Sequence, residues 1–394
     1  MIPNSAEIRS WLQANTPEVL RDPKHPDRGA LAWGGSRRPF HDPDVERWFR
    51  EVTARGWAVP DWPVEHGGAG LDAAATADVR AELAAVGAGG LLMNFGTLMI
   101  SPLITKFGTE EQCRLHLPRM AMGNVAWCLG FSEPDRGSDL AGLQCRAVKD
   151  GDDYIVTGAK VWNSHTDRAD YMELLVRTDP DAPKHKGISV LMVDLRSPGI
   201  SISPIELISG RSEFCYTTFD EVRVPVDNRL GEENEGWRLV QVGLRHEREA
   251  VVAMAMTDQG FTGRKRRSLI ELAQTAGPDA VPADVMADIA RLEIENLAFA
   301  ATKRRARQAA ESGQDCVHPS VLKYVGAQLT QRRRDLEMGL RGAGGVGWEG
   351  EGYDEEELRS TREWLRAFGL SIEGGTSEIQ LNIIAKRVLA LPTN

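Results

Sequence analysis

The sequence predicts a protein in three parts: a helical N-terminal segment, a middle antiparallel β-barrel and a C-terminal four-helix bundle. Two changes in the spacing of apolar residues lead to this prediction. The spacing is helical to about residue 120, alternates over about 121–228, and is helical again over 229–394. With 394 residues and 42% hydrophobic composition, the chain can fill the cores of two or three domains. We therefore expect domains at 1–120, 121–228 and 229–394.

The N-terminal segment contains amphipathic stretches separated by connections rich in Pro and Gly. Residues 8–20 and 45–55 carry apolar side chains at helical spacing and predict helices. Residues 57–70, Trp-Ala-Val-Pro-Asp-Trp-Pro-Val-Glu-His-Gly-Gly-Ala-Gly, have no periodicity. They predict a rigid loop between two helices.

The middle segment alternates apolar and polar residues. Leu143, Cys145 and Ala147 alternate with polar neighbours, and residues 150–153 make a turn into a run that starts at Tyr154. An apolar strand-like segment also leads into the turn at 132–139. Further strand-like runs lie at 172–176, 188–193 and 214–224.

The C-terminal segment has long stretches of helical spacing with short connections. Such connections favour an antiparallel bundle. We expect long helices at about 235–258, 283–312, 318–341 and 376–390, and shorter ones near 266–275 and 355–368.

Charge and hydropathy exclude several classes of protein. The formal charge of 47 minus 57, or −10, disfavours nucleic acid as the main partner. No apolar run approaches the roughly 18 residues of a membrane span, and the N-terminus has no signal-peptide pattern. We expect a soluble, cytoplasmic protein without a membrane partner. Basic clusters at 264–267, 303–305 and 332–334 are expected on solvated helix faces, with the phosphates of a ligand or a subunit interface as alternatives.

Neither cysteine nor histidine shows the spacing of a metal site. The histidines have no His-x-x-x-His spacing, and no Cys-x-x-Cys occurs. We therefore expect no metal and no disulfide framework. The cysteines should be reduced and mostly buried: Cys113, Cys128, Cys145, Cys215 and Cys316.

Two turns are rich in groups that can bind a ligand. Residues 127–139, Trp-Cys-Leu-Gly-Phe-Ser-Glu-Pro-Asp-Arg-Gly-Ser-Asp, end a strand in a turn that exposes backbone N–H groups and hydroxyls. Residues 158–164, Gly-Ala-Lys-Val-Trp-Asn-Ser, form a second such edge. Positions two apart on a strand share a face, so Trp162 and Ser164 can meet one flat polar ring.

Together these segments resemble the flavin-facing signature of the acyl-CoA dehydrogenase family. That signature is Thr/Ser-Glu-Pro-x-x-Gly-Ser-Asp followed by Lys-x-Trp-x-Thr/Ser, and the resemblance extends along most of the chain. It implies the acyl-CoA dehydrogenase fold, FAD as cofactor, and α,β-dehydrogenation of an acyl-CoA to the 2-enoyl-CoA. It also implies an electron-transfer flavoprotein as acceptor and a homo- or heterotetramer or dimer. The flavin-binding residues implied here are Leu129, Phe131, Ser132, Gly137, Ser138, Trp162, Asn163 and Ser164.

The glycine pattern at 342–347 satisfies Gly-x-Gly-x-x-Gly, but it follows a predicted helix and lacks a βαβ unit. A Rossmann site is therefore excluded. In the family, a Gly-Gly turn at this place receives the pyrophosphate and adenine of a neighbouring subunit's FAD, because glycine lets backbone N–H groups approach phosphate closely. The further cofactor-binding residues implied are Arg341, Gly344, Gly345, Thr376 and Glu378.

Dehydrogenation needs a base for the α-proton, and a carboxylate in a dry pocket suits this role. The usual family Glu lies in a Glu-Gly-Thr motif, but residues 372–380 read Ile-Glu-Gly-Gly-Thr-Ser-Glu-Ile-Gln, which places Gly374 there. Some members, isovaleryl-CoA dehydrogenase among them, use a Leu-x-x-Glu-Arg segment, which matches residues 244–248. Glu247 also falls within an apolar helical stripe and is the predicted base. The alternatives are Glu373 and a purely structural Glu247.

The resemblance also implies contacts to the thioester, and it leaves two departures open. The substrate-binding residues implied are Ser138, Arg245, Arg248, Gly374 and Gly375. The family's Arg-x-x-Phe-Gly motif has no counterpart in 268–280. Some bacterial members of the family that act on steroid side-chain CoA esters lack these contacts and work as mixed tetramers of two different chains. A non-catalytic or half-site partner subunit, and an O₂-using oxidase or monooxygenase, are the alternatives.

Overall fold

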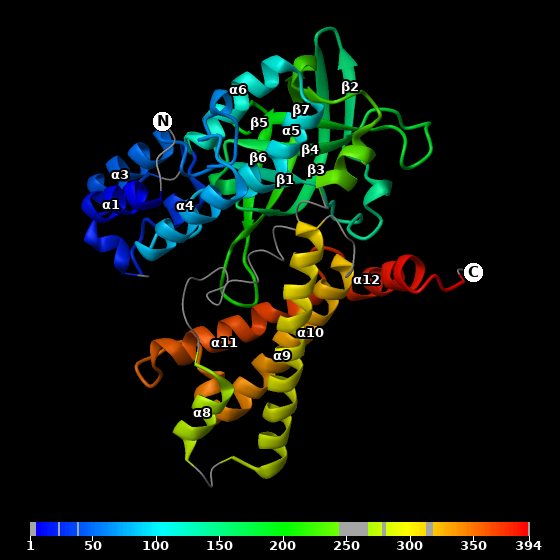
Figure 1. The fold of residues 1–394 in the computed structure, drawn as a ribbon. Helices are drawn as coiled ribbons and strands as arrows, with labels where there is room; N and C mark the ends of the chain where they lie inside the picture. The colour runs from blue at the N-terminus through cyan, green and yellow to red at the C-terminus, as the bar shows by residue number, and fades with distance from the viewer. Residues whose placement is uncertain are drawn as a thin grey trace. The chain divides into compact units, whose positions relative to one another are not determined.

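The structure is a computed structural model that describes residues 5–22, 24–37, 39–243, 267–277, 281–312 and 318–392 (Figure 1). Its contacts divide the chain into two compact units. The first comprises Met1–Ile205 and Glu213–Glu247 and holds the N-terminal helices and the sheet. The second comprises Glu206–Ser212 and Arg248–Asn394 and holds the C-terminal helices.

Helices and turns fill the first part of unit 1. Asp42 caps α3 by accepting from the Asp44 N–H, and Pro43 occupies its first turn, so the helix predicted at 45–55 is confirmed. The single helix predicted at 8–20 is wrong, because Pro17 cannot continue α1 and a separate 3₁₀ turn follows it. The elements are α1 (Ser5–Asn15), a 3₁₀ turn (Glu18–Arg21), α2 (Arg28–Trp33), α3 (Pro43–Ala54), a 3₁₀ turn (Val64–His66), α4 (Ala73–Ala85), a π turn (Gly96–Ile100), α5 (Ser101–Phe107) and α6 (Glu110–Ala121).

The connection at 57–70 is the loop that the sequence predicts. The Gly70 N–H donates to the Trp62 carbonyl at 2.9 Å, and the Leu71 N–H donates to the Pro60 carbonyl at 2.8 Å. A side chain on Gly68 would overlap the backbone of Trp62. Glycine is therefore required where the loop folds back on itself.

An eight-stranded sheet completes unit 1, in the order β6-β7-β3-β2-β4-β5-β8, with β1 paired to β4. The pairing is antiparallel except that β1 and one residue of β2 pair in parallel with β4. The strand predicted from Leu143 begins only at Arg146, because a 3₁₀ turn precedes it, and β6 was not predicted. The strands are β1 (Trp127–Gly130), β2 (Arg146–Asp150), β3 (Asp153–Ser164), β4 (Tyr171–Arg177), β5 (Ile188–Asp194), β6 (Ile200–Ile205), β7 (Phe214–Pro225) and β8 (Arg229–Leu230).

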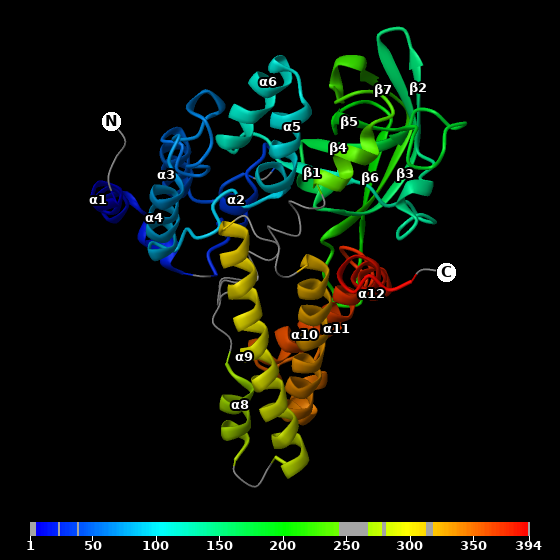
Figure 2. The same cartoon turned by 45° about the vertical axis from the view of Figure 1, so that its right-hand side comes forward.

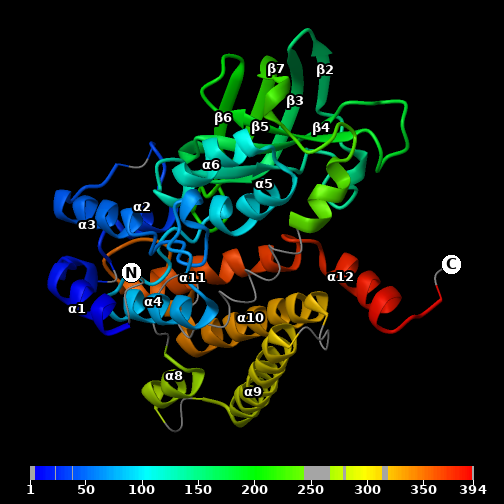
Figure 3. The same ribbon diagram turned by 45° about the horizontal axis from the view of Figure 1, so that its top comes forward.

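The sheet separates two apolar cores. On one face, Trp127 and Leu175 pack with Leu103 of α5 and Leu117 of α6, and both helices lie beside the sheet in every view (Figures 1 and 3). The other core contains alternate residues of the same strands, such as Leu174. Residues 236–243 are helical, and Leu239 and Val240 join the first core. This is the described start of the helix predicted at 235–258.

Unit 2 is built around α10, which contacts α8, α9, α11 and α12 (Figure 2). The helices predicted at 266–275, 283–312, 318–341 and 355–368 are confirmed, and 376–390 is helical through Val388. No helix in the described ranges of the chain is long and apolar enough to cross a membrane. The elements are α8 (Leu269–Ala276), α9 (Ala283–Glu311), α10 (Pro319–Arg341), a 3₁₀ turn (Gly342–Val346), α11 (Glu355–Ala367), a 3₁₀ turn (Phe368–Ser371), α12 (Ser377–Ile383) and a π turn (Ile384–Val388).

Candidate functional site

Within unit 1, hydrogen bonds join the turn after β1 to the end of β3. These are the two segments that the sequence singled out, although about thirty positions separate them in the chain. Three such bonds hold the two segments against each other, and each of them satisfies a backbone carbonyl of the 127–139 segment. They run from Asn163 Nδ2 to the Leu129 carbonyl (3.0 Å), from Lys160 Nζ to the Phe131 carbonyl (3.0 Å), and from the Val161 N–H to the Ser132 carbonyl (2.9 Å).

A buried ion pair supports this junction. Lys160 Nζ lies 2.9 Å from Glu133 Oε1, and the two side chains are 0% and 8% exposed. Glu133 also accepts from the backbone N–H groups of Gln144 and Cys145, at 2.7 and 2.8 Å. A buried pair needs such additional partners to offset its desolvation. Sequence reasoning missed this role, although Lys160 shares the buried face of β3 with Tyr154.

A β-bulge presents Trp162 at the end of β3. Lys160 pairs with Thr217 of β7, but Asn163 already pairs with Cys215, so two residues of β3 oppose one of β7. Trp162 has φ +61°, which is unusual for a bulky residue. Its indole is 55% exposed, whereas Asn163 is buried.

The outer face at this bulge is aromatic and hydroxylated. Ser164 is half-buried and pairs with Phe214 of β7. The Phe214 ring meets the Trp162 indole edge-on, with centroids 6.0 Å apart and planes at 86°. Asn163 points inward to Leu129, which leaves Trp162 and Ser164 on the outer side. A flat ligand with polar edges could stack on the indole and bond to the hydroxyl.

The turn at 133–139 is exposed at its tip. The backbones of Glu133 and Arg136 bond to each other at 3.0 Å in both directions, which closes a tight turn. Gly137 and Ser138 lie beyond it on the surface, and apart from its chain neighbours no described residue comes within 4 Å of a Cβ built on Gly137. Asp139 pairs with Lys184 at 2.8 Å, and this hydrogen bond lowers the pKa of the Asp139 carboxyl.

Two ionisable side chains are buried in the first core. Glu173 of β4 lies opposite Leu129 of β1 and is 1% exposed, and burial raises the pKa of its carboxyl to about 8. Its Oε1 has no hydrogen-bond partner among the described residues. His116 of α6 packs against Trp127 and Tyr171, and burial, with a smaller contribution from Arg119, lowers its pKa to about 4.

Within unit 2, the predicted thioester-binding loop precedes α12. Gly374 and Gly375 have φ +62° and +91°, and their carbonyl oxygens are held by Gln380 and Lys323. Thr376 caps α12, since its hydroxyl accepts from the Ile379 N–H at 3.3 Å.

The flanking carboxylates of this loop are on the surface. The pKa of Glu378 is lowered by its own backbone N–H and then by the Thr376 hydroxyl. Glu373 pairs with Arg366 at 2.7 Å and is 39% exposed on its side chain. A solvated, ion-paired carboxylate is a poorer base than a desolvated one, which argues against Glu373 as the base.

The glycine turn after α10 is packed between helices. Arg341 pairs with Glu337 and Glu356, at 3.3 and 2.9 Å, and its side chain is 7% exposed. The Gly345 carbonyl accepts from the Thr361 hydroxyl at 3.0 Å, and a Cβ on Gly345 would lie 2.8 Å from the Met338 carbonyl oxygen, which is backbone and cannot move aside. Packing alone therefore requires glycine here. Contact of this turn with a cofactor stays a prediction.

The basic cluster at 332–334 is only partly a solvated face. Arg332 fits that expectation, because it is exposed and pairs with Glu295. Arg334 does not, because it is 3% exposed and pairs with Glu337 and Glu363. One arginine of a basic cluster on a helix can be buried when nearby carboxylates neutralise its charge.

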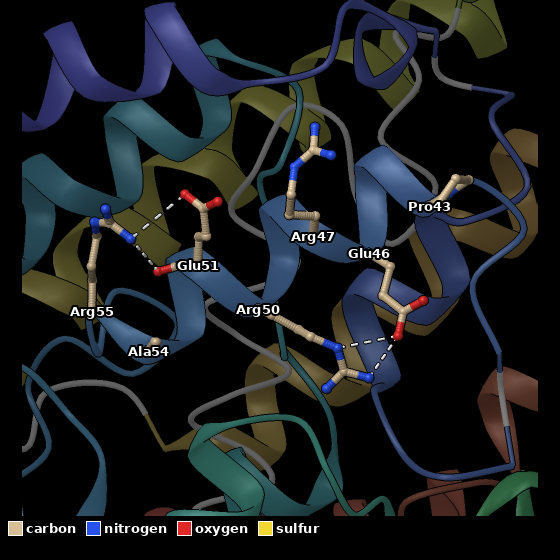
Figure 4. Close-up of a pocket in the computed structure, with 7 residues that line it drawn as sticks. All are labelled: Pro43, Glu46, Arg47, Arg50, Glu51, Ala54 and Arg55. Carbon is tan, nitrogen blue, oxygen red and sulfur yellow. Dashed lines mark hydrogen bonds and ion pairs between the residues drawn. The ribbon is translucent and has the colours of Figure 1, made fainter.

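Figure 4 shows a hollow on α3 that is not a candidate site. Its charges are paired along the helix, Arg50 with Glu46 at 2.6 Å and Arg55 with Glu51 at 3.9 Å. Such exposed pairs are typical of a solvated helix surface. The lining residues are Pro43, Glu46, Arg47, Arg50, Glu51, Ala54 and Arg55.

Several predictions fall outside the described residues. They are the base Glu247, the substrate-binding residues Arg245 and Arg248, Cys316, and positions 264–266 of the basic cluster at 264–267. Three other cysteines, Cys128, Cys145 and Cys215, are buried free thiols, as expected. Burial raises the pKa of Cys128 to about 12.

Three family profiles match the chain. They are the N-terminal domain of acyl-CoA dehydrogenase at residues 34–124, its middle domain at 128–222 and its C-terminal domain at 234–389. The chain therefore belongs to the acyl-CoA dehydrogenase family. This membership confirms the predicted fold and the prediction of an oxidoreductase of this class.

Curated relatives and solved structures agree with the profiles. The chain is 35% identical to acyl-CoA dehydrogenase FadE26 of Mycobacterium tuberculosis, over 87% of this chain and 88% of the relative. It is 32% identical to acyl-CoA dehydrogenase IpdE1 of the same organism, over 98% and 97%. The ChsE4–ChsE5 complex from M. tuberculosis aligns with TM-score 0.74 and 32% identity over 100% and 99%. The Tcur3481–Tcur3483 steroid acyl-CoA dehydrogenase aligns with TM-score 0.76 and 28% identity over 99% and 97%.

Proposed function

We propose that this chain is an FAD-dependent acyl-CoA dehydrogenase that converts an acyl-CoA thioester to the 2-enoyl-CoA. The observation that carries this proposal is the outward-facing Trp162 on its bulge, beside Ser164 and above the buried Lys160–Glu133 pair. A strained, exposed indole held by a rigid support suits a planar cofactor ring. Strain of this kind is retained where the surrounding structure fixes it, often at functional sites.

The residues present in unit 1 fit a flavin. Trp162 offers a stacking face, while the hydroxyls of Ser132 and Ser164 and the exposed turn at Gly137 and Ser138 offer polar contacts to the ring edge. When bound, FAD would accept the hydride that leaves Cβ. Lys160 and Glu133 act behind this surface and hold the two segments at a fixed spacing.

We propose that Glu247 is the base that removes the α-proton, because Glu373, the alternative carboxylate, is already in an ion pair. Glu373 is half-exposed and paired with Arg366, and Gly374 has no side chain at the usual place of the base. Ser138, Arg245 and Arg248 remain the proposed contacts to the acyl-CoA, together with the Gly374–Gly375 loop.

The Glu247→Gln variant tests this assignment, because it keeps the shape of the side chain and removes its basicity. We expect FAD and ligand binding to be retained and flavin reduction by acyl-CoA to slow at least about 10³-fold. Glu373→Gln is the matched control and should change the rate little. Near-normal reduction in Glu247→Gln, with collapse in Glu373→Gln, would return the base to the loop.

Gly374 provides a second, gain-of-function arm of the same test. In the Glu247→Gln background, Gly374→Glu should restore some activity on short straight-chain acyl-CoA esters. No described atom beyond its chain neighbours lies within 4 Å of a Cβ built on Gly374, so there is room for a side chain, while the φ of +62° adds strain that keeps the restored activity below that of wild type. Rapid-mixing absorbance measurements of the flavin would quantify both arms.

We further propose a mixed assembly and a bulky substrate. The solved relatives are named as two-component assemblies, one of them a steroid acyl-CoA dehydrogenase, and the Arg-x-x-Phe-Gly motif is missing here. A partner chain would then complete the adenine half of the FAD site. A glycine in place of the usual Glu leaves room for branched or ring-bearing acyl groups. We also propose that an electron-transfer flavoprotein accepts the electrons from the reduced flavin and that the protein is cytoplasmic.

A further inference from the structure

The Gly374–Gly375 loop is held from two sides by long side chains of unit 2. Lys323, on α10, donates from Nζ to the Gly375 carbonyl oxygen at 2.6 Å. Gln380, on α12, donates from Nε2 to the Gly374 carbonyl oxygen at 3.1 Å, and more weakly to that of Gly375 at 3.4 Å. Two consecutive carbonyl groups in a short loop are therefore fixed by side chains instead of by backbone pairing.

Fixing a carbonyl also fixes the N–H of the same peptide. The peptide unit is planar and trans, so its N–H points away from its C=O. Gln380 thus sets the direction of the Gly375 N–H, and Lys323 sets that of the Thr376 N–H. Within the described part of the chain, no acceptor is found for the N–H groups of Gly374, Gly375 or Thr376. They are available to a ligand.

The loop is open beside Gly374 and filled beside Gly375. No described atom beyond its chain neighbours comes within 4 Å of a Cβ built on Gly374. A Cβ on Gly375 would lie 2.5 Å from Gln380 Nε2, so a side chain there would displace the amide. Gln380 itself is 2% exposed, and its Oε1 has no partner among the described residues. The Gln380 amide therefore forms its hydrogen bonds with this loop.

The cation of Lys323 adds an electrostatic effect to the geometric one. The ammonium group is half-buried, and burial lowers its pKa, while Glu373 and Glu378 act in the opposite sense. A cation bonded to a carbonyl polarises that peptide and makes its N–H a stronger donor. This is the kind of preorganised dipole that stabilises negative charge on a reacting oxygen.

We propose that Lys323 and Gln380 are positioning residues that orient the N–H groups of Gly375 and Thr376 toward the thioester carbonyl oxygen. This inference rests on the proposed function and adds to it the two side chains that prepare the carbonyl site. Neither touches the substrate. Lys323 lies 52 positions from Gly375 in the sequence, so the contact arises only in the fold.

The carbonyl stretching frequency of a bound thioester tests the proposal without relying on turnover. The probes are 2-butenoyl-CoA and 2-octenoyl-CoA labelled with ¹³C at the thioester carbonyl, bound to the purified holoenzyme. Hydrogen bonding to the oxygen shifts the stretch to lower wavenumber, as seen by infrared difference spectroscopy. We expect Lys323→Met and Gln380→Leu each to lose half or more of the wild-type shift. Lys323→Arg, which keeps the charge and the donor, should retain most of it.

Matched controls separate positioning from general loss of stability. Lys386→Met removes an exposed charge from the same unit, and Gln331→Leu removes an amide that donates to the Ala367 carbonyl at 3.0 Å. Neither should change the stretch. With saturated acyl-CoA as substrate, the rate of flavin reduction should fall about 10-fold or more in Lys323→Met and in Gln380→Leu, and KM should change less. The reason is that the loop donors act mainly on charge that develops during the reaction.

The outcomes distinguish this inference from the proposed function. An unchanged stretch in Lys323→Met and Gln380→Leu, with only a lower melting temperature, would show that the clamp is structural and would overturn the proposal. A wild-type protein that binds the probe without any downshift would overturn it as well. If wild type shows a Lys323-dependent downshift but no acyl-CoA reduces its flavin, the positioning inference stands and the proposed reaction fails.

Discussion

Glu173 is an acid buried in an apolar core, and its environment sets how the stability of the protein depends on pH. The folded-state pKa of about 8 lies above the ordinary 4.5 because burial disfavours the charged carboxylate. Between those values the folded state holds a proton that the unfolded state has released. The stabilising contribution is therefore complete below about pH 4.5 and is lost as pH rises toward 8.

The Glu173→Gln variant removes this titration while keeping an amide of similar size. We expect its free energy of unfolding to vary less over pH 5–8 than that of wild type, and to exceed wild type at pH 8 by an amount on the order of a few kcal/mol. Urea titrations at several pH values would measure this difference. Glu111→Gln, at an exposed position, is the control. Parallel pH profiles for wild type and Glu173→Gln would refute the assignment.

His116 has the opposite effect on the pH dependence of stability, and it acts at lower pH. Its folded-state pKa of about 4 lies below the ordinary 6.5, because burial disfavours the imidazolium. The stability that its neutral ring contributes is present above about pH 6.5 and is lost as pH falls through 4. The two buried groups therefore oppose each other over pH 4.5–6.5.

Single residues differ in how readily the sequence reveals them. Trp162 and Ser164 stand out because an aromatic residue and a hydroxyl residue lie two positions apart on one strand and therefore share a face. Lys160 was visible in principle, since it follows the alternation of buried positions on β3. Lys323 carries no local signal, because an isolated lysine on a helix is normally solvated and only the fold brings it to the Gly375 carbonyl.

At the scale of elements, the bulge in β3 holds Trp162 at a strained backbone angle on the proposed cofactor surface. Trp162 has φ +61°, and a non-glycine residue in this region costs roughly 1–2 kcal/mol. Trp162→Gly should relieve that cost and leave the protein without ligand more stable by about 1 kcal/mol. The same change should weaken FAD binding, because the stacking face is lost. Thermal unfolding and FAD titration would give the two effects separately.

Trp162→Ala is the matched control for the bulge. It removes the same indole but keeps a Cβ at positive φ, so FAD binding should fall without the gain in stability. Full FAD occupancy with an unchanged flavin spectrum in both variants would remove Trp162 from the cofactor site. A loss of stability in Trp162→Gly would show that the packing of the indole against Phe214 outweighs the backbone strain.

Most elements were predictable because local signals agreed with the final packing. Ser268 and Glu271 form a capping box at α8, and Asp354 and Glu357 form another at α11. The departures have local causes. Pro17 divides the first predicted helix. β6 alternates isoleucine with serine, as a strand does, but it is short, partly exposed and contains Pro204. The β3 bulge depends on one backbone angle that no spacing rule encodes.

At the scale of the whole molecule, the order of helical, β and helical segments was enough to predict the family's architecture. The family profiles follow the same order along the chain. What the sequence alone did not give is the support behind the two candidate surfaces. Those supports are long-range contacts, Lys160 with Glu133 and Lys323 with Gly375, and they depend on tertiary packing.

Anaerobic titration of the flavin by acyl-CoA tests the central claim most directly. The protein would be purified alone and after co-expression with a second acyl-CoA dehydrogenase chain, then mixed with straight-chain, branched and steroid acyl-CoA esters. We predict little FAD in the chain alone, full FAD in the co-expressed assembly, and bleaching of that flavin with matching formation of 2-enoyl-CoA. Stoichiometric FAD in the chain alone would contradict the mixed assembly. FAD-loaded protein that no acyl-CoA bleaches would contradict acyl-CoA dehydrogenation itself.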